Sequence, residues 1–357
     1  MTAFTGHAAL KLANLPSYID RITDRLTSFQ SQLTLEGEAQ IYEFPWGRAR
    51  LHMPMGELRL EAEAETADGL ARVKDILATA VELYAKDDNP NIVWQGDLTS
   101  NRLSQFRLAT VREAYNVTPH MRRVRFEAED IGRFESFGGM HIRLLLPTAE
   151  VPYPIWPEQG PNGLPLWADE TRKPKARVYT IREINRAAGY FDVDMVTHDD
   201  GGPGARWAAQ SAPGMEVGVM GPLGRPIPEA SWYVMGADET GIPAISRLLS
   251  RFAPEARGVV HIEVASPEEQ QDLPQHAGFD VRWIFRNGIA PGTDRRLADT
   301  LCAIQWPVGV NGFGWFAGEA GMAKIVREHW RDTLGLDRTK TLVAGYWRIG
   351  AAGVMAG

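Results

Sequence analysis

Four consecutive residues, Arg177-Val178-Tyr179-Thr180, combine a cation, an aromatic ring and a hydroxyl within one extended segment. Side chains two apart on a strand lie on the same face, so Arg177 and Tyr179 point the same way. A guanidinium donates two parallel hydrogen bonds to phosphate oxygens, a phenol ring offers a flat stacking surface, and Thr180 adds a hydroxyl. This combination suits a cofactor with phosphates and a planar ring, such as a flavin nucleotide. Taken alone, the four residues favour an ordinary barrel strand with an exposed arginine.

A second segment suited to binding is Gly201-Gly202-Pro203-Gly204-Ala205-Arg206-Trp207-Ala208. It follows a predicted strand and opens a predicted helical turn. Small residues allow the backbone N–H groups at a helix start to approach an anion closely. The segment therefore predicts a phosphate site made by Gly202, Gly204, Ala205, Arg206 and Trp207. Taken alone, it is more typical of a Gly-Pro loop with a tryptophan in the core.

Two further features follow these segments closely in the sequence. Gly221-Pro222-Leu223-Gly224-Arg225 ends the strand-rich region and is suited to a hinge or to a cofactor contact. His198 stands at a strand end beside Asp199 and Asp200, and we assign it to the cofactor site. The eight histidines form no H-x-x-x-H or similar cluster, so we predict no metal site in the protein.

The composition limits the class of protein. A chain of 357 residues is long enough for two or three domains, and 44% apolar with 23% charged residues is typical of a globular protein. The single cysteine, Cys302, excludes an internal disulfide and cannot supply the four thiolates of an iron–sulfur cluster. We find no membrane-spanning stretch and no secretory signal, so we expect a cytoplasmic protein without membrane insertion.

The net charge of −7 is unevenly spread along the chain: residues 1–100 carry −6, residues 101–186 carry +4 and residues 187–357 carry −5. A locally basic segment in an acidic protein suggests a small anionic ligand, because nucleic acid usually requires a larger positive surface. We therefore expect no nucleic-acid partner. Charge alone favours a plainer interpretation, a solvated face with an excess of arginine.

The elements that would position these residues begin with an α+β module over residues 1–100. Apolar spacings of three and four predict two helices, and alternation predicts three strands, at Ser17–Leu33, Ala67–Tyr84, Ala39–Phe44, Ala49–His52 and Leu58–Ala62. The polar run Lys86–Asn91 breaks this pattern. We therefore place a domain boundary near residue 100 and expect the first domain to be separable.

Residues 101–228 predict an antiparallel β-barrel. Six strands are expected, at Phe106–Glu113, Met121–Ala128, His141–Leu146, Arg177–Glu183, Tyr190–Thr197 and Met215–Met220. Within Tyr190–Thr197 we expect Asp192 and Asp194 to point outward. The proline-rich stretch Val151–Lys175 predicts a long loop.

Residues 229–357 predict an α/β domain of the nucleotide-binding type. Strands alternating with helices are typical of a parallel sheet covered on both faces. The strands are expected at Trp232–Gly236, Val259–Val264, Val281–Phe285, Gly314–Ala317 and Thr341–Trp347. The helices are expected at Ile242–Phe252, Arg295–Ile304 and Gly321–Leu334.

Taken together, residues 101–350 resemble the siderophore-interacting protein family, which are FAD-dependent ferric-siderophore reductases related to ferredoxin reductases. Residues 1–100 resemble a domain of unknown function that sometimes precedes them. The resemblance rests on Thr118-Pro119-His120-Met121-Arg122-Arg123-Val124, His141-Ile142-Arg143-Leu144, Arg177-Val178-Tyr179-Thr180-Ile181-Arg182, the Gly202 to Ala208 run, Gly221-Pro222-Leu223-Gly224, Ala237-Asp238-Glu239-Thr240-Gly241-Ile242-Pro243-Ala244-Ile245, Ala317-Gly318-Glu319-Ala320 and Gly345-Tyr346-Trp347-Arg348.

The resemblance implies that FAD is held by Arg177, Tyr179 and Thr180, with Gly204, Ala205 and Arg206 near its phosphates. It also implies a basic patch beside the flavin for an anionic ferric chelate, for which the candidates are Arg143, Arg206 and Arg348. Thr240 begins a helix in the α/β domain and completes the candidate cofactor residues. No acid–base catalytic residue is expected, because electron transfer to ferric iron needs little proton transfer.

The main functional hypothesis is a cytoplasmic reductase that releases iron from ferric siderophores. Two alternatives stay open: a general flavin or diaphorase-type reductase, and a protein that binds ferric siderophores without reducing them. NADH or NADPH is the expected electron donor, although Gly236-Ala237-Asp238-Glu239-Thr240-Gly241 lacks the G-x-G-x-x-G spacing and places two carboxylates near an expected pyrophosphate. A ferredoxin is the alternative donor.

Overall fold

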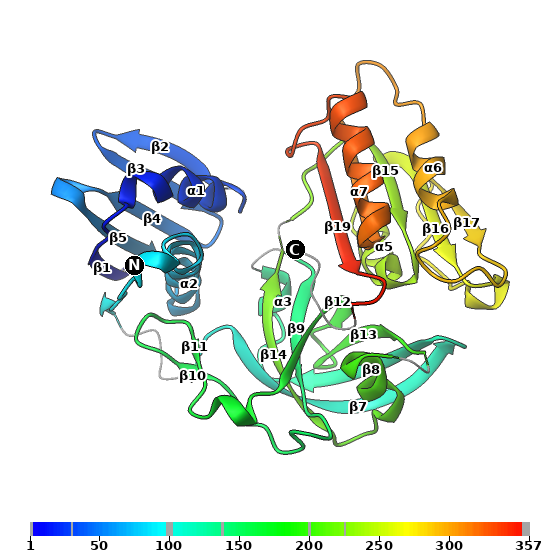
Figure 1. Ribbon diagram of the computed structural model, residues 1–357, viewed down its shortest axis with the longest axis horizontal. Coiled ribbons are helices and arrows are strands. Elements are labelled where there is room, and N and C mark those ends of the chain that lie inside the picture. Colours follow the sequence, from blue (N-terminus) through cyan, green and yellow to red (C-terminus); the bar gives the residue numbers. More distant parts are fainter. Residues whose placement is uncertain are drawn as a thin grey trace.

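The computed structural model describes residues 3–29, 31–97, 103–136, 139–198, 201–224 and 226–351. The chain forms an N-terminal α+β domain, a closed antiparallel barrel and a C-terminal parallel-sheet domain, as the sequence predicts (Figure 1). The N-terminal and C-terminal domains lie on either side of two barrel strands, β9 (His141–Leu146) and β14 (Glu216–Leu223). The boundary predicted near residue 100 falls in residues 98–102, outside the described residues, so the domain limits stay a prediction.

The N-terminal domain is an antiparallel sheet with helices on one face, in the strand order β2-β3-β4-β5-β1-β6. Helix α2 (Ala67–Tyr84) is capped by Thr66, whose side chain accepts a hydrogen bond from the Gly69 backbone. Its apolar face packs with α1 against the sheet. The other elements are β1 (Phe4–Lys11), α1 (Leu15–Thr27), β2 (Gln32–Glu36), β3 (Ala39–Phe44), β4 (Gly47–His52), η1 (Pro54–Gly56), β5 (Glu57–Ala64), η2 (Lys86–Asp88) and β6 (Gln95–Gly96).

The prediction for the first helix, Ser17–Leu33, is wrong at its end. Helix α1 stops at Thr27, and Leu33 lies in β2, where it pairs with Tyr42 of β3. Sheet pairing thus overrides the helical pattern after Thr27. Strand β1 has no counterpart among the predicted elements, because its buried side is made mostly of small residues and so gives a weak strand signal: Gly6, Ala8 and Leu10.

The barrel closes in the order β12-β13-β8-β7-β14-β9, and every neighbouring pair is antiparallel. An apolar core that includes Phe126, Phe134 and Phe191 fills its interior. The predicted loop Val151–Lys175 contains little regular structure. The remaining elements of this body are β7 (Phe106–Thr118), β8 (Met121–Ala128), α3 (Arg133–Ser136), β10 (Glu158–Gln159), β11 (Pro165–Leu166), η3 (Glu170–Arg172), β12 (Lys175–Asn185), β13 (Tyr190–Val196) and α4 (Pro203–Gln210).

Two aspartates on β13 point away from the apolar core, as predicted, but are not exposed to solvent. Asp192 and Asp194 alternate with core residues as predicted, yet both are buried. Asp194 accepts hydrogen bonds from Arg123 at 2.6 and 2.9 Å and from Arg182 at 3.0 Å. Asp192 accepts a similar pair from Arg125 at 2.8 and 2.9 Å. The arginine side chains therefore cover this face and neutralise it.

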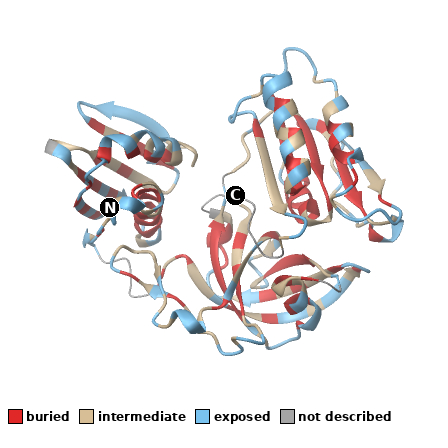
Figure 2. Cartoon of the chain, viewed as in Figure 1, coloured by how far each residue is buried: buried red, intermediate tan, exposed pale blue. Residues whose placement is uncertain are grey.

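The C-terminal domain is a parallel sheet in the order β17-β16-β15-β18-β19. One apolar core lies between the sheet and α5, and a second lies under α6 and α7. All eight residues of β18 are buried, and buried residues concentrate between the helix layers (Figure 2). The elements are β15 (Trp232–Ala237), η4 (Glu239–Gly241), α5 (Ile242–Leu249), β16 (Arg257–Val264), η5 (Pro267–Glu269), β17 (Phe279–Phe285), α6 (Arg296–Ala303), β18 (Gly312–Glu319), α7 (Ala320–Glu328), η6 (His329–Thr333) and β19 (Thr341–Trp347).

We expect Asp194→Asn to lower the free energy of unfolding by about 3 kcal/mol, because it leaves the half-buried Arg123 and Arg182 without their counter-charge. Urea titration followed by tryptophan fluorescence measures this change. Glu183→Gln, which removes an exposed carboxylate from the same barrel, should change the free energy by less than about 0.5 kcal/mol. Equal unfolding midpoints for Asp194→Asn and the parent would contradict the prediction.

Candidate functional site

Strand β12 carries the three residues whose pattern predicts cofactor binding. It pairs with β9 on one edge and with β13 on the other, which fixes its backbone inside the barrel wall. Arg177 and Tyr179 both approach Gly204 at the start of α4. A Cβ atom on Gly204 would lie 2.1 Å from Tyr179 Oη and 3.6 Å from Arg177 Cγ, so only glycine permits this approach. The two segments that the sequence analysis selects are therefore adjacent in space.

The start of α4 has the properties of an anion site. Its N-cap residue, Gly202, makes no side-chain cap hydrogen bond with the first turn. Arg206 is exposed, and its guanidinium donates a hydrogen bond to the Gly201 carbonyl at 2.7 Å. Backbone N–H groups, the positive end of the helix and a guanidinium thus lie beside Tyr179. This arrangement suits a phosphate group.

The other predicted residues of this segment lie around the same helix. Trp207 packs in the barrel core, with its ring centroid 6.1 Å from that of Phe126, and so anchors α4. Ala205 is half-buried in the first turn. His198 is exposed after β13, and its carbonyl accepts a hydrogen bond from the Gly201 N–H at 3.0 Å. Asp199 and Asp200, which the sequence analysis places beside it, lie outside the described residues.

Thr180 lies where the barrel meets the parallel-sheet domain. It is directly opposite His141 in the β12–β9 ladder. Its Oγ1 atom is buried and forms no short hydrogen bond among the described residues, and the side chain that interacts with it is that of Tyr346. A buried hydroxyl whose hydrogen bonding is incomplete costs up to about 1–3 kcal/mol. A bound group that offered it a hydrogen bond would therefore be stabilised at this position.

Tyr346 of β19 reaches the same place from the other domain. Its Oη atom lies 2.5 Å from His141 Nε2, and the two ring planes are 88° apart. Burial, with a smaller effect of the Arg247 charge, lowers the pKa of His141 to about 4, so the imidazole is neutral at pH 7. Burial raises the pKa of Tyr346, so its hydroxyl keeps its proton, and two neutral groups share the hydrogen bond. Sequence reasoning assigned no role to either residue.

The three predicted substrate arginines lie on two sides of this junction. Arg143 follows His141 by two residues on β9, and Arg348 follows Tyr346 by two residues beyond β19. Each of these two arginines is thus two residues away from one partner of the hydrogen bond between His141 and Tyr346. Arg143 is half-buried and Arg348 is exposed. Arg206 belongs instead to the start of α4, with Arg177 on the same side.

Thr240 lies in η4, directly after β15, and η4 contacts β13 of the barrel. Its backbone N–H donates a hydrogen bond to Asp238 Oδ1 at 2.9 Å, and its hydroxyl binds the same oxygen. The other carboxylate oxygen of Asp238 accepts a hydrogen bond from Trp347 Nε1 at 2.7 Å. Burial, followed by the charge of Glu239, raises the pKa of Asp238 to about 6.

Further carboxylates occupy the carboxyl edge of the parallel sheet. Glu239 accepts two hydrogen bonds from Arg286, both at 2.7 Å. Burial raises the pKa of Glu263 to about 7, and the neighbouring Arg286 opposes that rise. Glu319 accepts hydrogen bonds from two N–H groups at the start of α7. Donors that a pyrophosphate would use at this edge are therefore bound to the protein's own carboxylates.

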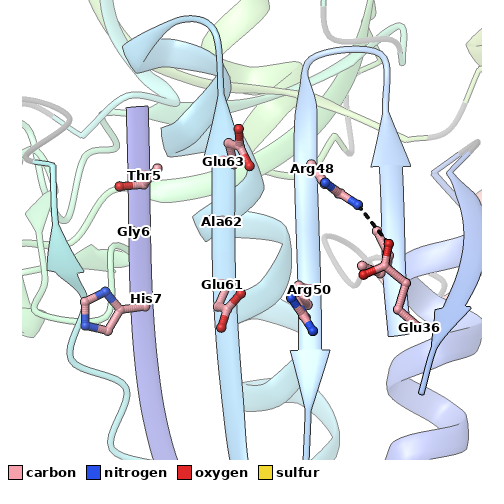
Figure 3. A pocket seen from close by; sticks show the side chains of 10 residues that line it. Thr5, Gly6, His7, Glu36, Arg48, Arg50, Glu61, Ala62 and Glu63 are labelled. Atoms are coloured by element: carbon pink, nitrogen blue, oxygen red, sulfur yellow. Dashed lines mark ion pairs between the residues drawn. The ribbon is translucent and has the colours of Figure 1, made fainter. Parts of the chain in front are cut away.

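A separate hollow of about 370 Å³ lies on the open face of the N-terminal sheet (Figure 3). Its charged walls come from neighbouring strands: Arg48 and Arg50 from β4, and Glu61 and Glu63 from β5. Arg48 pairs with Glu36 at 3.6 Å, as the dashed line shows. This hollow mixes both signs of charge and lies on the sheet face opposite the helices, away from β12.

Within the described residues, no group of three or more His, Cys, Asp or Glu side chains is arranged to hold a metal ion. Across the same residues, we find no helix with the length and apolar character needed to cross a membrane.

Comparison with known families divides the chain into three matched regions. Residues 8–95 match a family described as an uncharacterized protein conserved in bacteria (DUF2218). Residues 110–226 match the siderophore-interacting FAD-binding domain, and residues 230–350 match the siderophore-interacting protein family.

Individual relatives agree with these matches. The ferric vibriobactin reductase ViuB of Vibrio cholerae is 31% identical over 256 residues, which cover 67% of this chain and 88% of that protein. A siderophore utilization protein from T. fusca is 33% identical, with a TM-score of 0.64 over 70% of this chain and 95% of its own. The siderophore-interacting protein SipS from Aeromonas hydrophila is 32% identical, with a TM-score of 0.60 over 69% of this chain and 93% of its own. The chain belongs to the siderophore-interacting protein family and contains its FAD-binding domain.

Proposed function

We propose that this protein is an FAD-dependent reductase that reduces ferric siderophores and releases ferrous iron in the cytoplasm. The observation that carries the proposal is the hydroxyl of Thr180, which is buried without a short hydrogen bond on the strand that also holds Arg177 and Tyr179. The similarity to a ferric vibriobactin reductase supports the same chemistry.

The residues present fit FAD in two respects. The close approach of Gly204 to Tyr179 sets a helix start beside the tyrosine ring, where the pyrophosphate would find N–H donors together with Arg177 and Arg206. Thr180 Oγ1 would donate to or accept from the polar edge of the flavin ring. We infer that Gly202, Ala205, Trp207, His198 and Thr240 support this site.

Bound FAD would supply electrons one at a time to ferric iron. Ferric iron is held tightly by the hard oxygen ligands of siderophores, whereas ferrous iron is held poorly, so reduction releases the metal. The chain's own part is to attract and orient an anionic chelate. Arg143 follows His141 by two residues and Arg348 follows Tyr346 by two residues, and we infer that both orient the chelate near the contact between His141 and Tyr346. Arg206 adds positive charge at the α4 side.

An anaerobic oxidation experiment tests the function directly. Protein loaded with FAD and then fully reduced is mixed with a ferric siderophore under argon, while flavin absorbance and a ferrous-iron dye are followed. We expect reoxidation with release of ferrous iron. Binding of the chelate without reoxidation would identify a binding protein. Fast reoxidation by quinones with slow reoxidation by ferric siderophores would identify a diaphorase-type reductase.

We expect Arg177→Ala to weaken FAD binding about tenfold or more. The variant loses a charge-assisted pair of hydrogen bonds, which contributes roughly 1.5 to 3 kcal/mol. Fluorescence titration of the apoprotein with FAD measures the dissociation constant. Arg112→Ala, which removes an exposed arginine from β7, serves as the control and should bind FAD like the parent. Unchanged FAD affinity in Arg177→Ala would rule out this role.

We expect Arg143→Ala and Arg348→Ala to raise KM for an anionic ferric chelate, with FAD content unchanged. A partly exposed charge contributes up to about 1 kcal/mol, which corresponds to a rise of up to about fivefold in KM. Steady-state kinetics at low salt measures the change, because screening weakens such contacts. Arg331→Ala removes an exposed arginine elsewhere in the C-terminal domain and is the control. KM values equal to that of the parent in both Arg143→Ala and Arg348→Ala would exclude the basic patch.

We propose NADH or NADPH as the electron donor and a reduced ferredoxin as the alternative. The parallel sheet supports a nicotinamide donor, because its order changes direction between β15 and β18, where dinucleotides bind in such folds. Three carboxylates at that edge oppose tight binding of a pyrophosphate: Asp238 and Glu319, which are buried, and Glu239, which is half-buried. We therefore expect flavin bleaching to need about millimolar nicotinamide, as measured by stopped-flow mixing under argon. Bleaching by a reduced ferredoxin alone would contradict this assignment.

A further inference from the structure

Helix α2 of the N-terminal domain buries charged side chains against the barrel. Arg72 and Asp75, one helical turn apart, are 6% and 8% exposed. Arg72 donates a hydrogen bond to Asp75 at 3.2 Å, and its guanidinium lies 5.9 Å from the centre of the Trp46 ring. Buried charges are costly unless they are paired, so this ion pair must be satisfied by what lies opposite α2.

The barrel supplies the missing partners. Gln105 Nε2 donates to the other oxygen of Asp75 at 2.8 Å. Arg72 reaches across to the Pro222 carbonyl at 3.5 Å. The neighbouring residue, Gly221, donates its N–H to the Gln105 carbonyl at 3.0 Å. A single buried network therefore joins α2 to the segment Gly221–Gly224.

Arg133 of the barrel also binds the segment Gly221–Gly224. Its guanidinium donates to the Gly221 carbonyl at 3.3 Å and also to the Ser104 carbonyl. Burial raises the pKa of Asp75, and the charge of Arg72 is the strongest opposing influence, followed by Gln105 and Arg133. The carboxylate thus balances a group of buried cations on both sides of the domain contact.

The segment Gly221–Gly224 leads directly to the proposed flavin site. Leu223 pairs with His141, and His141 pairs in turn with Thr180. A Cβ on Gly224 would lie 3.1 Å from His141 Nδ1, so the segment packs against that ring. Met220, at the start of the same turn, pairs with Arg143. The pKa of Arg143 is lowered by burial and raised by the charge of Asp75.

We propose that the N-terminal domain is a positioning module for the FAD site, in which Arg72 and Asp75 hold Gly221–Gly224 against His141 and Thr180. The domain thereby acts on the flavin edge without contacting the reacting atoms. This role rests on the proposed placement of FAD at Thr180. It gives the matched DUF2218 region a function in this chain that is distinct from binding a ligand of its own.

The first test is Asp75→Asn in the full-length protein. The amide still accepts a hydrogen bond from Gln105, but its NH₂ group faces Arg72, which is also a donor. We expect a lower melting temperature and an FAD dissociation constant about tenfold higher in apoprotein titrations. Asp87→Asn removes an exposed carboxylate of the same domain and should leave both values unchanged. An unchanged FAD dissociation constant in Asp75→Asn would overturn the proposal.

The double variant Arg72→Met/Asp75→Leu separates positioning from stability. Replacing a buried ion pair with apolar side chains usually preserves stability, yet here it removes the hydrogen bonds to Gln105 and Pro222. We expect a melting temperature above that of Asp75→Asn, because no buried charge is left without its counter-charge, with FAD binding still weakened about tenfold. Recovery of parental FAD affinity would show that the network is structural only.

Arg72→Lys gives a second version of this test if the double variant does not fold. Lysine keeps the positive charge beside Asp75 but lacks the planar fork that reaches Asp75 and Pro222 together. We expect weakened FAD binding with little loss of stability, and unchanged affinity would overturn the proposal. All of these titrations use FAD alone. A parent protein that binds FAD but does not reduce ferric siderophores would therefore refute the proposed function and leave this inference intact.

Discussion

The closure of the barrel around β12 is the constraint on which the site depends. Because β12 is hydrogen-bonded along both edges, its side chains alternate between a face toward α4 and a face toward the C-terminal domain. Arg177 and Tyr179 take the first face, and Thr180 takes the second. A shift of one residue in this register would exchange the two sets. The barrel therefore decides which side chains meet a phosphate and which meet the ring edge.

Polar contacts, which are directional, fix the position of the C-terminal domain on the barrel. Arg247 of α5 is buried and donates hydrogen bonds to the carbonyls of Ile181 and Phe134 at 3.0 and 3.2 Å. On the other side, Glu269 accepts hydrogen bonds from Thr118 and from the His120 backbone. Directional bonds at two separated places restrict rotation more than a flat apolar contact would. This restriction is what keeps Tyr346 beside His141.

Local patterns predicted much of the fold, and contacts distant in sequence account for the rest. The bounds of α2, β8, β9 and β19 follow directly from periodicity, as does the shared face of Arg177 and Tyr179. The contact between His141 and Tyr346 joins residues 205 positions apart, and no spacing signals it. Likewise, the sequence around Asp75 resembles that of an ordinary surface charge on α2.

The independence of the N-terminal domain stays a prediction. The polar run after α2 favours a separable domain. The buried ion pair of Arg72 and Asp75 opposes that expectation, because removing residues 1–100 would leave Gln105 and Arg133 facing water.

The distribution of arginine partners explains how a basic segment can bind an anion in an acidic protein. Much of the positive charge in residues 101–186 is used inside the protein, since Arg123, Arg125 and Arg182 are paired with buried aspartates on β13. Within the described ranges, Arg143 and Arg177 of this segment, and Arg206 and Arg348 beyond it, have no carboxylate ion pair, a property that they share with Arg112, Arg122, Arg172 and Arg186. The first four of these lie around β12, at α4 and at the junction with β19. Positive charge without a carboxylate ion pair is therefore present at the proposed site, although the middle segment is also neutralised in part by β13, and an anionic ligand that approached β12 would meet the field of these guanidinium groups.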